Sequence, residues 1–107
     1  METQIQVWQG DYGYSLLFTL LDAQGNPFDL TDNTGLTFVG QLAQFTQTSF
    51  SGAMVVADPT AGTCAYVVGA GNFSMAGQYN AQIRIAFVSE VVTFGNIQVN
   101  VNPKIPY

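Results

Sequence analysis

The sequence contains no histidine, and only two of its 107 residues, Arg84 and Lys104, are basic. Without histidine, the chain lacks the most common general base of acid–base catalysis and the most common metal ligand. Two cations cannot neutralise a run of phosphates, and the formal net charge is −5. We therefore expect no nucleic-acid partner.

Cysteine is almost absent as well, since Cys64 is the only one. A single thiol forms no internal disulfide, and without histidine there is no Cys/His metal cage. The alternating stretch TCAYVV around Cys64 predicts a buried strand residue rather than a reactive thiol. We expect no disulfide, no metal and no cofactor.

Long apolar runs are also missing. The longest, around LLFTLL, falls far short of the roughly 18 residues of a membrane span. The first ten residues, METQIQVWQG, have neither the basic nor the apolar region of an export signal. The sequence therefore predicts a soluble chain with no membrane partner and no export signal of its own.

Charge of either sign is scarce, because charged residues make up 8% of the chain and apolar residues 48%. The chain is too apolar to be disordered, yet it has little of the charge that normally coats a free surface. Uncharged polar faces can hydrogen-bond across a subunit interface without desolvating ions. We expect much of the surface to lie against other protein, in a homo-oligomer or a multi-copy assembly.

Alternation of apolar and polar residues is the strongest pattern present. In GQYNAQIRIAFV, every second side chain from Tyr79 to Phe87 is apolar, and the polar residues Gln78, Asn80, Gln82 and Arg84 share the other face. About seven such segments, separated by Gly, Pro, Asp and Asn turns, predict an all-β, antiparallel sandwich. We expect one domain over residues 1–107, with a core at about 4–101. Pro103 cannot continue a ladder, so residues 102–107 should form an extended tail.

Three local features sharpen this prediction. YSLLFTLL is apolar on both faces, which is typical of a central strand. Gly40 lies within a strand pattern and indicates a bulge or a close backbone approach. The inward positions change from even to odd numbers near Gly95, which predicts a β-bulge there.

The segment MAGQYNA is similar to the corner before strand F of immunoglobulin-like domains. There a tyrosine hydroxyl bonds back to the corner backbone, two residues before a cysteine. Tyr79 occupies the tyrosine position and Ala81 that of the cysteine. This similarity predicts an immunoglobulin-like sandwich without the disulfide, although Tyr79 as a plain core residue remains an alternative.

Catalytic chemistry finds little support. Serine and threonine have no base partner, so no hydrolase triad is available and we expect no enzyme. Asp22, Asp29 and Asp32 form the one acidic cluster, but they lack the DxDxDG spacing of a calcium loop. We interpret them as turn residues and leave open whether they bind an ion.

Several aromatic and tail residues are candidates for an interface. Aromatic side chains at strand ends or loops can dock a protein or stack on a sugar, so weak glycan contact is retained as an alternative. The candidate interface residues are Trp8, Tyr12, Tyr14, Phe45, Phe50, Pro103, Ile105 and Tyr107.

Four short motifs follow one another in order along the chain. They are Gly10-Asp11 at a strand start, a turn with Asp22, Gly25, Pro27 and Asp29-Leu30-Thr31, a turn with Asp58-Pro59 and Gly62, and Gly77-x-Tyr79. Each is a generic turn by itself. Together, over about residues 4–101, they resemble the N-terminal domain of the baseplate upper protein family of tailed bacteriophages.

The resemblance implies a non-enzymatic structural module of the virion, made in the bacterial host cytoplasm, that docks on other virion proteins. Family members usually continue into a linker and assembly region, whereas this chain ends at NPKIPY, so we expect no fused fibre. Three placements stay open: baseplate component, capsid decoration protein and fibre-anchoring adaptor. The alternatives are a carbohydrate-binding module and an immunoglobulin-like host-adhesion domain.

Overall fold

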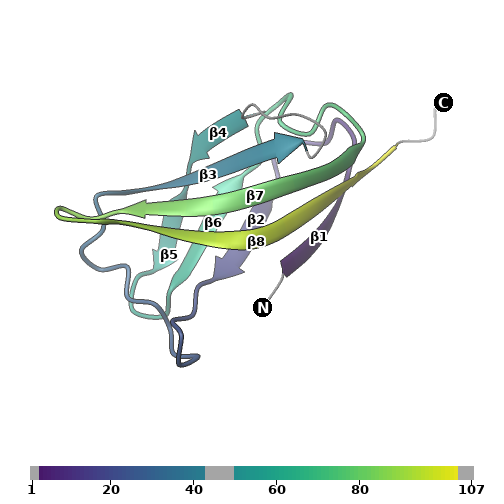
Figure 1. Ribbon diagram of the computed structural model, residues 1–107. Coiled ribbons are helices and arrows are strands. Elements are labelled where there is room, and N and C mark those ends of the chain that lie inside the picture. The colour runs from purple at the N-terminus through teal and green to yellow at the C-terminus, as the bar shows by residue number, and fades with distance from the viewer. Residues whose placement is uncertain (1–2, 43–49, 104–107) are drawn as a thin grey trace.

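The structure, a computed structural model, describes residues 3–42 and 50–103, without the side chains of Thr3 and Asn96. In these residues it contains eight strands and no helix, and so no helix able to cross a membrane. The strands form two sheets (Figure 1). They are β1 (Thr3–Trp8), β2 (Ser15–Thr19), β3 (Gly35–Leu42), β4 (Phe50–Ala53), β5 (Val55–Asp58), β6 (Thr63–Val67), β7 (Gly77–Ala86) and β8 (Val91–Asn102).

The strand order is that of an immunoglobulin-like sandwich, as expected. One sheet has the order β1-β8-β7-β3-β4 and the other β2-β6-β5. In immunoglobulin terms, β2, β6 and β5 take the places of strands B, E and D, and β3, β7 and β8 those of C, F and G. The eighth strand is β4, which pairs with β3 in a stretch for which the sequence predicted no strand.

One pairing departs from the predicted antiparallel arrangement. β1 runs parallel to β8, with Thr3 opposite Ile97 and Trp8 opposite Asn102. Since β1 and β8 are far apart in sequence, no turn motif fixes their relative direction. The prediction of an entirely antiparallel sandwich was wrong at this pair.

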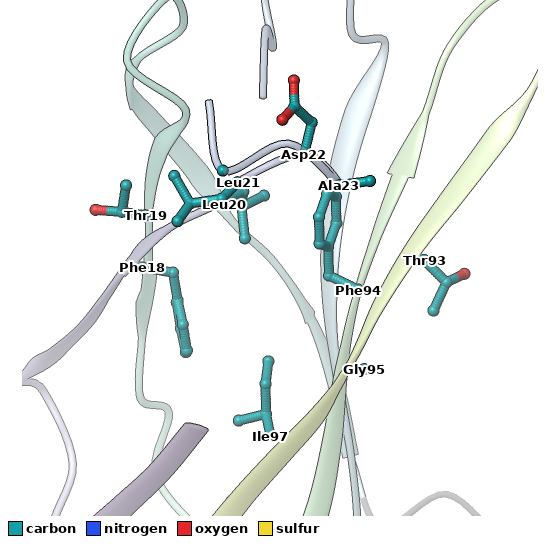
Figure 2. A pocket seen from close by; sticks show the side chains of 11 residues that line it. Phe18, Thr19, Leu20, Leu21, Asp22, Ala23, Thr93, Phe94, Gly95 and Ile97 are labelled. Carbon is teal, nitrogen blue, oxygen red and sulfur yellow. The ribbon is translucent and has the colours of Figure 1, made fainter. Parts of the chain in front are cut away.

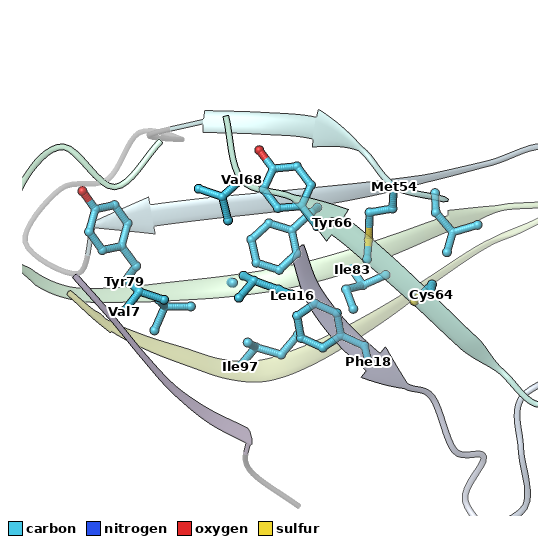
Figure 3. Packing of buried hydrophobic residues seen from close by; sticks show 14 of the residues in the cluster. Val7, Leu16, Phe18, Met54, Cys64, Tyr66, Val68, Tyr79, Ile83 and Ile97 are labelled. Carbon is cyan, nitrogen blue, oxygen red and sulfur yellow. The ribbon is translucent and has the colours of Figure 1, made fainter. Parts of the chain in front are cut away.

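The core lies between the two sheets and follows the predicted alternation. Along β7, Tyr79, Ala81, Ile83 and Ile85 are buried, and the polar residues between them are exposed. Rings fill the centre: the Phe38 ring stacks on that of Tyr66, with centroids 4.7 Å apart. Figure 3 shows this packing from close by. Each large side chain buried in this way contributes about 1.5–3 kcal/mol to stability.

The prediction that β2 is a central strand was wrong. β2 is an edge strand of the three-stranded sheet, and its burial alternates strictly. Leu16 and Phe18 point into the core, whereas Leu17 is 78% exposed. The apolar residues on both faces of β2 therefore have different roles: one face packs in the core, and the other is exposed to solvent.

The prediction near Gly95 is confirmed, whereas at Gly40 a side chain makes the close approach and neither pairing of β3 shifts register. A Cβ on Gly40 would lie 2.5 Å from the Phe50 ring, so the glycine leaves room for that ring. Near Gly95 the pairing of β7 with β8 shifts register: Ala81 faces Ile97, but Ile83 faces Phe94. The three-residue step on β8 against two on β7 is the predicted bulge.

The tyrosine corner is present too. The Tyr79 side chain is buried, and its hydroxyl donates a hydrogen bond to the Met75 carbonyl, 3.2 Å away. This bond connects the chain before β7 to the beginning of that strand.

Candidate docking surfaces

Trp8 and Tyr12, two of the predicted interface residues, lie at the end of β1 and in the chain that follows it. Their side chains are 54% and 65% exposed, and the Asp11 amide donates to the Trp8 carbonyl at 3.2 Å. Tyr14 is only partly exposed, and within the described residues its buried hydroxyl has no hydrogen-bond partner. Burial, together with the charge of Asp11, raises the pKa of Tyr14. Of the three aromatic side chains, those of Trp8 and Tyr12 are therefore accessible to a partner, and that of Tyr14 is partly buried.

The remaining predicted residues are less favourable. The Phe50 ring packs against the core cluster, edge-on to Phe73 with ring centroids 5.1 Å apart. It therefore does not contribute to a docking surface. Pro103 follows the end of β8 and is exposed. Phe45, Ile105 and Tyr107 lie outside the described residues.

The structure brings together a surface that the sequence analysis missed, the outward side of the three-stranded sheet. Leu17 lies opposite Ala65, which lies opposite Val55, so one row crosses all three strands. Opposed residues on one face are in side-chain contact range, about 5 Å between Cβ atoms. Val67 adds to the row two residues further along β6. Leu17, Val55 and Val67 are 78%, 64% and 54% exposed.

We call this surface the outer face; it consists of Ser15, Leu17, Thr19, Val55, Ala57, Thr63, Ala65 and Val67. None of these eight residues is charged, but past the register shift in β5 the exposed Asp58 lies opposite Thr63, at the end of the face. Single exposed aliphatic residues are normal, whereas a contiguous exposed group is a candidate for a contact surface. The sequence pattern that indicates this face is SLLFTLL, in which Leu17 belongs to the second apolar side that predicted a central strand.

The Asp-rich loops serve as turn structures. One Asp22 carboxylate oxygen accepts the Gln24 and Asn26 amides, at 3.0 and 2.9 Å. One oxygen of Asp29 accepts both the amide and the hydroxyl of Thr31, which lowers the pKa of that carboxyl. Within the described residues, no group of three or more His, Cys, Asp or Glu side chains could hold a metal ion.

The same loops line an open hollow of about 480 Å³ next to the β7–β8 hairpin. Its lining combines four carboxylates with an apolar floor: Asp22, Asp29, Asp32 and Glu90, with Pro27, Phe28 and Phe87. With no basic side chain in this lining, the hollow disfavours anionic ligands.

Cys64 is not a candidate nucleophile. The thiol lies between Phe18 on β2 and Val56 on β5, and the residue is 1% exposed. Burial raises its pKa to about 11. A nucleophilic cysteine needs the opposite, an accessible thiolate. The prediction of a buried strand residue is confirmed.

The chain matches a protein-family model, whereas no curated protein matches it. The family model described as the BppU N-terminal domain covers residues 1–107, the whole chain. This agrees with the immunoglobulin-like strand order and with the motifs that run from Gly10 to Tyr79. The chain therefore belongs to the baseplate upper protein N-terminal domain family, a family of bacteriophage baseplate structural proteins.

Proposed function

We propose that this protein is a non-enzymatic docking module of the phage virion that attaches to a neighbouring virion protein through the outer face. The observation that carries the proposal is the uncharged aliphatic row of Leu17, Ala65 and Val55 across all three strands. Burying such a row costs no desolvation of ions and gains about 25 cal/mol for each Å² of apolar surface.

The charge of the chain bears on which neighbour fits. Seven carboxylates against two basic residues give a net charge of −5, which repels acidic neighbours. The aliphatic row of the outer face brings no charged group into a contact; the exposed side of β7 also lacks a carboxylate, but its residues are polar and include Arg84. Membership of a baseplate protein family supports a place in the baseplate, which we favour over capsid decoration or a separate fibre adaptor.

The test is incorporation of a Leu17→Lys variant into phage particles. Because the side chain is 78% exposed, the substitution should change the free energy of unfolding by less than about 0.5 kcal/mol. It should nevertheless reduce the copies per particle at least about tenfold, the effect of losing about 1.4 kcal/mol of contact energy. Quantitative mass spectrometry of purified particles measures the copies.

The matched control is Gln78→Lys, which places the same charge on the exposed side of β7 in the other sheet. This variant should be incorporated normally. Particles that carry a full complement of the Leu17→Lys chain would rule out the outer face as the docking surface.

Glycan binding stays a second candidate because Trp8 and Tyr12 are both exposed, at the end of β1 and in the chain that follows it. Aromatic rings presented together can stack on a sugar. In the same particles, Trp8→Ala separates the two functions. Normal incorporation with lost host attachment would favour a glycan role, whereas unchanged attachment would discard it.

A further inference from the structure

In the described part of the chain, β8 is paired along half of its outer edge. It extends over Val91–Asn102, but β1 lies beside it only from Ile97 to Asn102. Among the described residues, no strand lies on that side of Val91–Asn96, which we call the free half of β8. An unpaired strand edge is a template for another strand.

The backbone direction in the free half follows from a printed bond and from strand alternation. The Phe87 amide donates to the Glu90 carbonyl at 2.8 Å, so Glu90 is directed toward β7. Backbone groups alternate sides along an antiparallel strand. Val91 and Thr93 therefore turn their N–H and C=O groups away from β7, toward the open side.

A cleft of about 560 Å³ lies beside this edge, between the two sheets. Phe18 lies on its β2 side and Phe94 on its β8 side, with Ile97 below them (Figure 2). Phe18 and Ile97 are otherwise buried core residues, so the cleft opens directly onto the hydrophobic core. β2 is also an edge strand, and among the described strands none connects it to the free half of β8.

A backbone edge next to an apolar cleft suits an extended peptide better than a helix or a small molecule. The ladder would bind the main chain of the peptide, and the cleft would take every second side chain. Six residues of strand span about 20 Å. β1 already occupies the rest of the edge, so an added strand would continue its line.

The charge of the cleft also restricts the occupant. Asp22 is the one charged residue in the lining, and the lining contains no cation. A neutral or basic segment therefore fits, and an acidic one does not. Because the chain as a whole is acidic, a second copy of it is the poorer partner.

We propose that the free half of β8 and the adjoining cleft accept an extended segment of a neighbouring virion polypeptide, added as a strand with alternate apolar side chains. The proposal deepens the docking role and rests on it for the source of the segment. It uses a different surface from the outer face, so the two can fail separately.

The test uses the full chain and a blocked synthetic peptide, KVTVTVTK. Hydrogen exchange and amide chemical shifts are followed by NMR during titration. Binding should be saturable and should slow exchange of the Val91 and Thr93 amides by at least about tenfold. The outer-face residues Val55 and Val67 should not respond, and a Leu17→Lys variant should bind the peptide normally.

Two controls isolate strand addition. A peptide with alternate amides N-methylated cannot form the ladder and should not bind. Thr93→Pro removes an N–H from the open side only, so the fold should persist and peptide binding should be lost. If the Thr93→Pro variant does not fold, the N-methylated peptide still tests strand addition on the unsubstituted protein.

Three results would overturn the proposal. They are no response to KVTVTVTK, equal binding of the N-methylated peptide, and protection of the same amides in the free protein that rises with its own concentration. The last result would make a second copy the occupant.

Discussion

Cys64 shows how strongly this fold controls a single residue. Its thiol lies on the central strand of the smaller sheet, is 1% exposed and has a pKa raised to about 11 by burial. At pH 8 only about one thiol in a thousand would be ionised, and the thiolate is the reactive form. Access and ionisation thus both oppose reaction.

We expect Cys64 in the native protein to resist a thiol reagent at pH 8, and one equivalent to react once the chain is unfolded in denaturant. Absorbance of the released chromophore measures both. Ser74→Cys in a Cys64→Ala background places a thiol at an exposed position and should react at once. Rapid stoichiometric labelling of native Cys64 would contradict its burial.

At the residue scale, the sequence predicted what depends on local pattern. Alternation identified the buried Cys64, and Gly40 indicated a crowded position in a strand, although the neighbour there is the Phe50 ring and not a backbone. It could not place Phe50 itself, because the ring packs against Phe38 and Tyr66 on other strands and against Phe73 in the connection between β6 and β7. Residue type alone does not distinguish a core aromatic from an exposed one.

At the scale of elements, two tyrosine hydroxyls fasten the connection between β6 and β7. The Tyr66 hydroxyl donates to the Asn72 side-chain oxygen, which also accepts the Gly69 amide at 2.7 Å. Further along, the Tyr79 hydroxyl donates to the Met75 carbonyl. The segment crosses from one sheet to the other, so these bonds fix where β7 begins.

We expect Tyr79→Phe to lower the free energy of unfolding by about 1 kcal/mol, the usual contribution of one such hydrogen bond. The ring remains in the core, so no cavity forms. Chemical denaturation measures the loss, and Tyr12→Phe serves as the control because Tyr12 is 65% exposed. Equal stability of Tyr79→Phe and the unsubstituted protein would mean that the corner bond contributes nothing.

Features formed by residues close in sequence were easier to predict than the pairing of strands that are far apart in sequence. The bulge near Gly95 and the corner at Tyr79 are local and were found. The edge position of β2 and the parallel pairing of β1 depend on strands more than forty residues away, and period-two patterns do not encode which strand lies beside which. The outer face was missed for this reason, since its members come from three separate strands.

At the scale of the whole molecule, we expect the isolated protein to be monomeric at micromolar concentration. A homodimer through the outer face would set two copies of the same acidic chain against each other, whereas a neighbouring virion protein need not be acidic. Net charge of −5 adds repulsion between copies. Multiple copies in a particle would then come from attachment to a scaffold.

Light scattering over a range of concentrations measures the mass, with Leu17→Lys as the control that removes any outer-face association. A constant trimeric or hexameric mass would show that the domain builds its own ring. A monomer that is recruited to particles agrees with docking on a partner.

The parallel pair of β1 and β8 also has a mechanical consequence. The chain enters β1 at Thr3, beside Ile97, and leaves β8 at Asn102, beside Trp8. Tension between these two ends pulls the strands lengthwise in opposite directions, so their hydrogen bonds are sheared together instead of being peeled apart one at a time. A module held under load in this direction would yield only when the whole ladder between its first and last strands breaks at once.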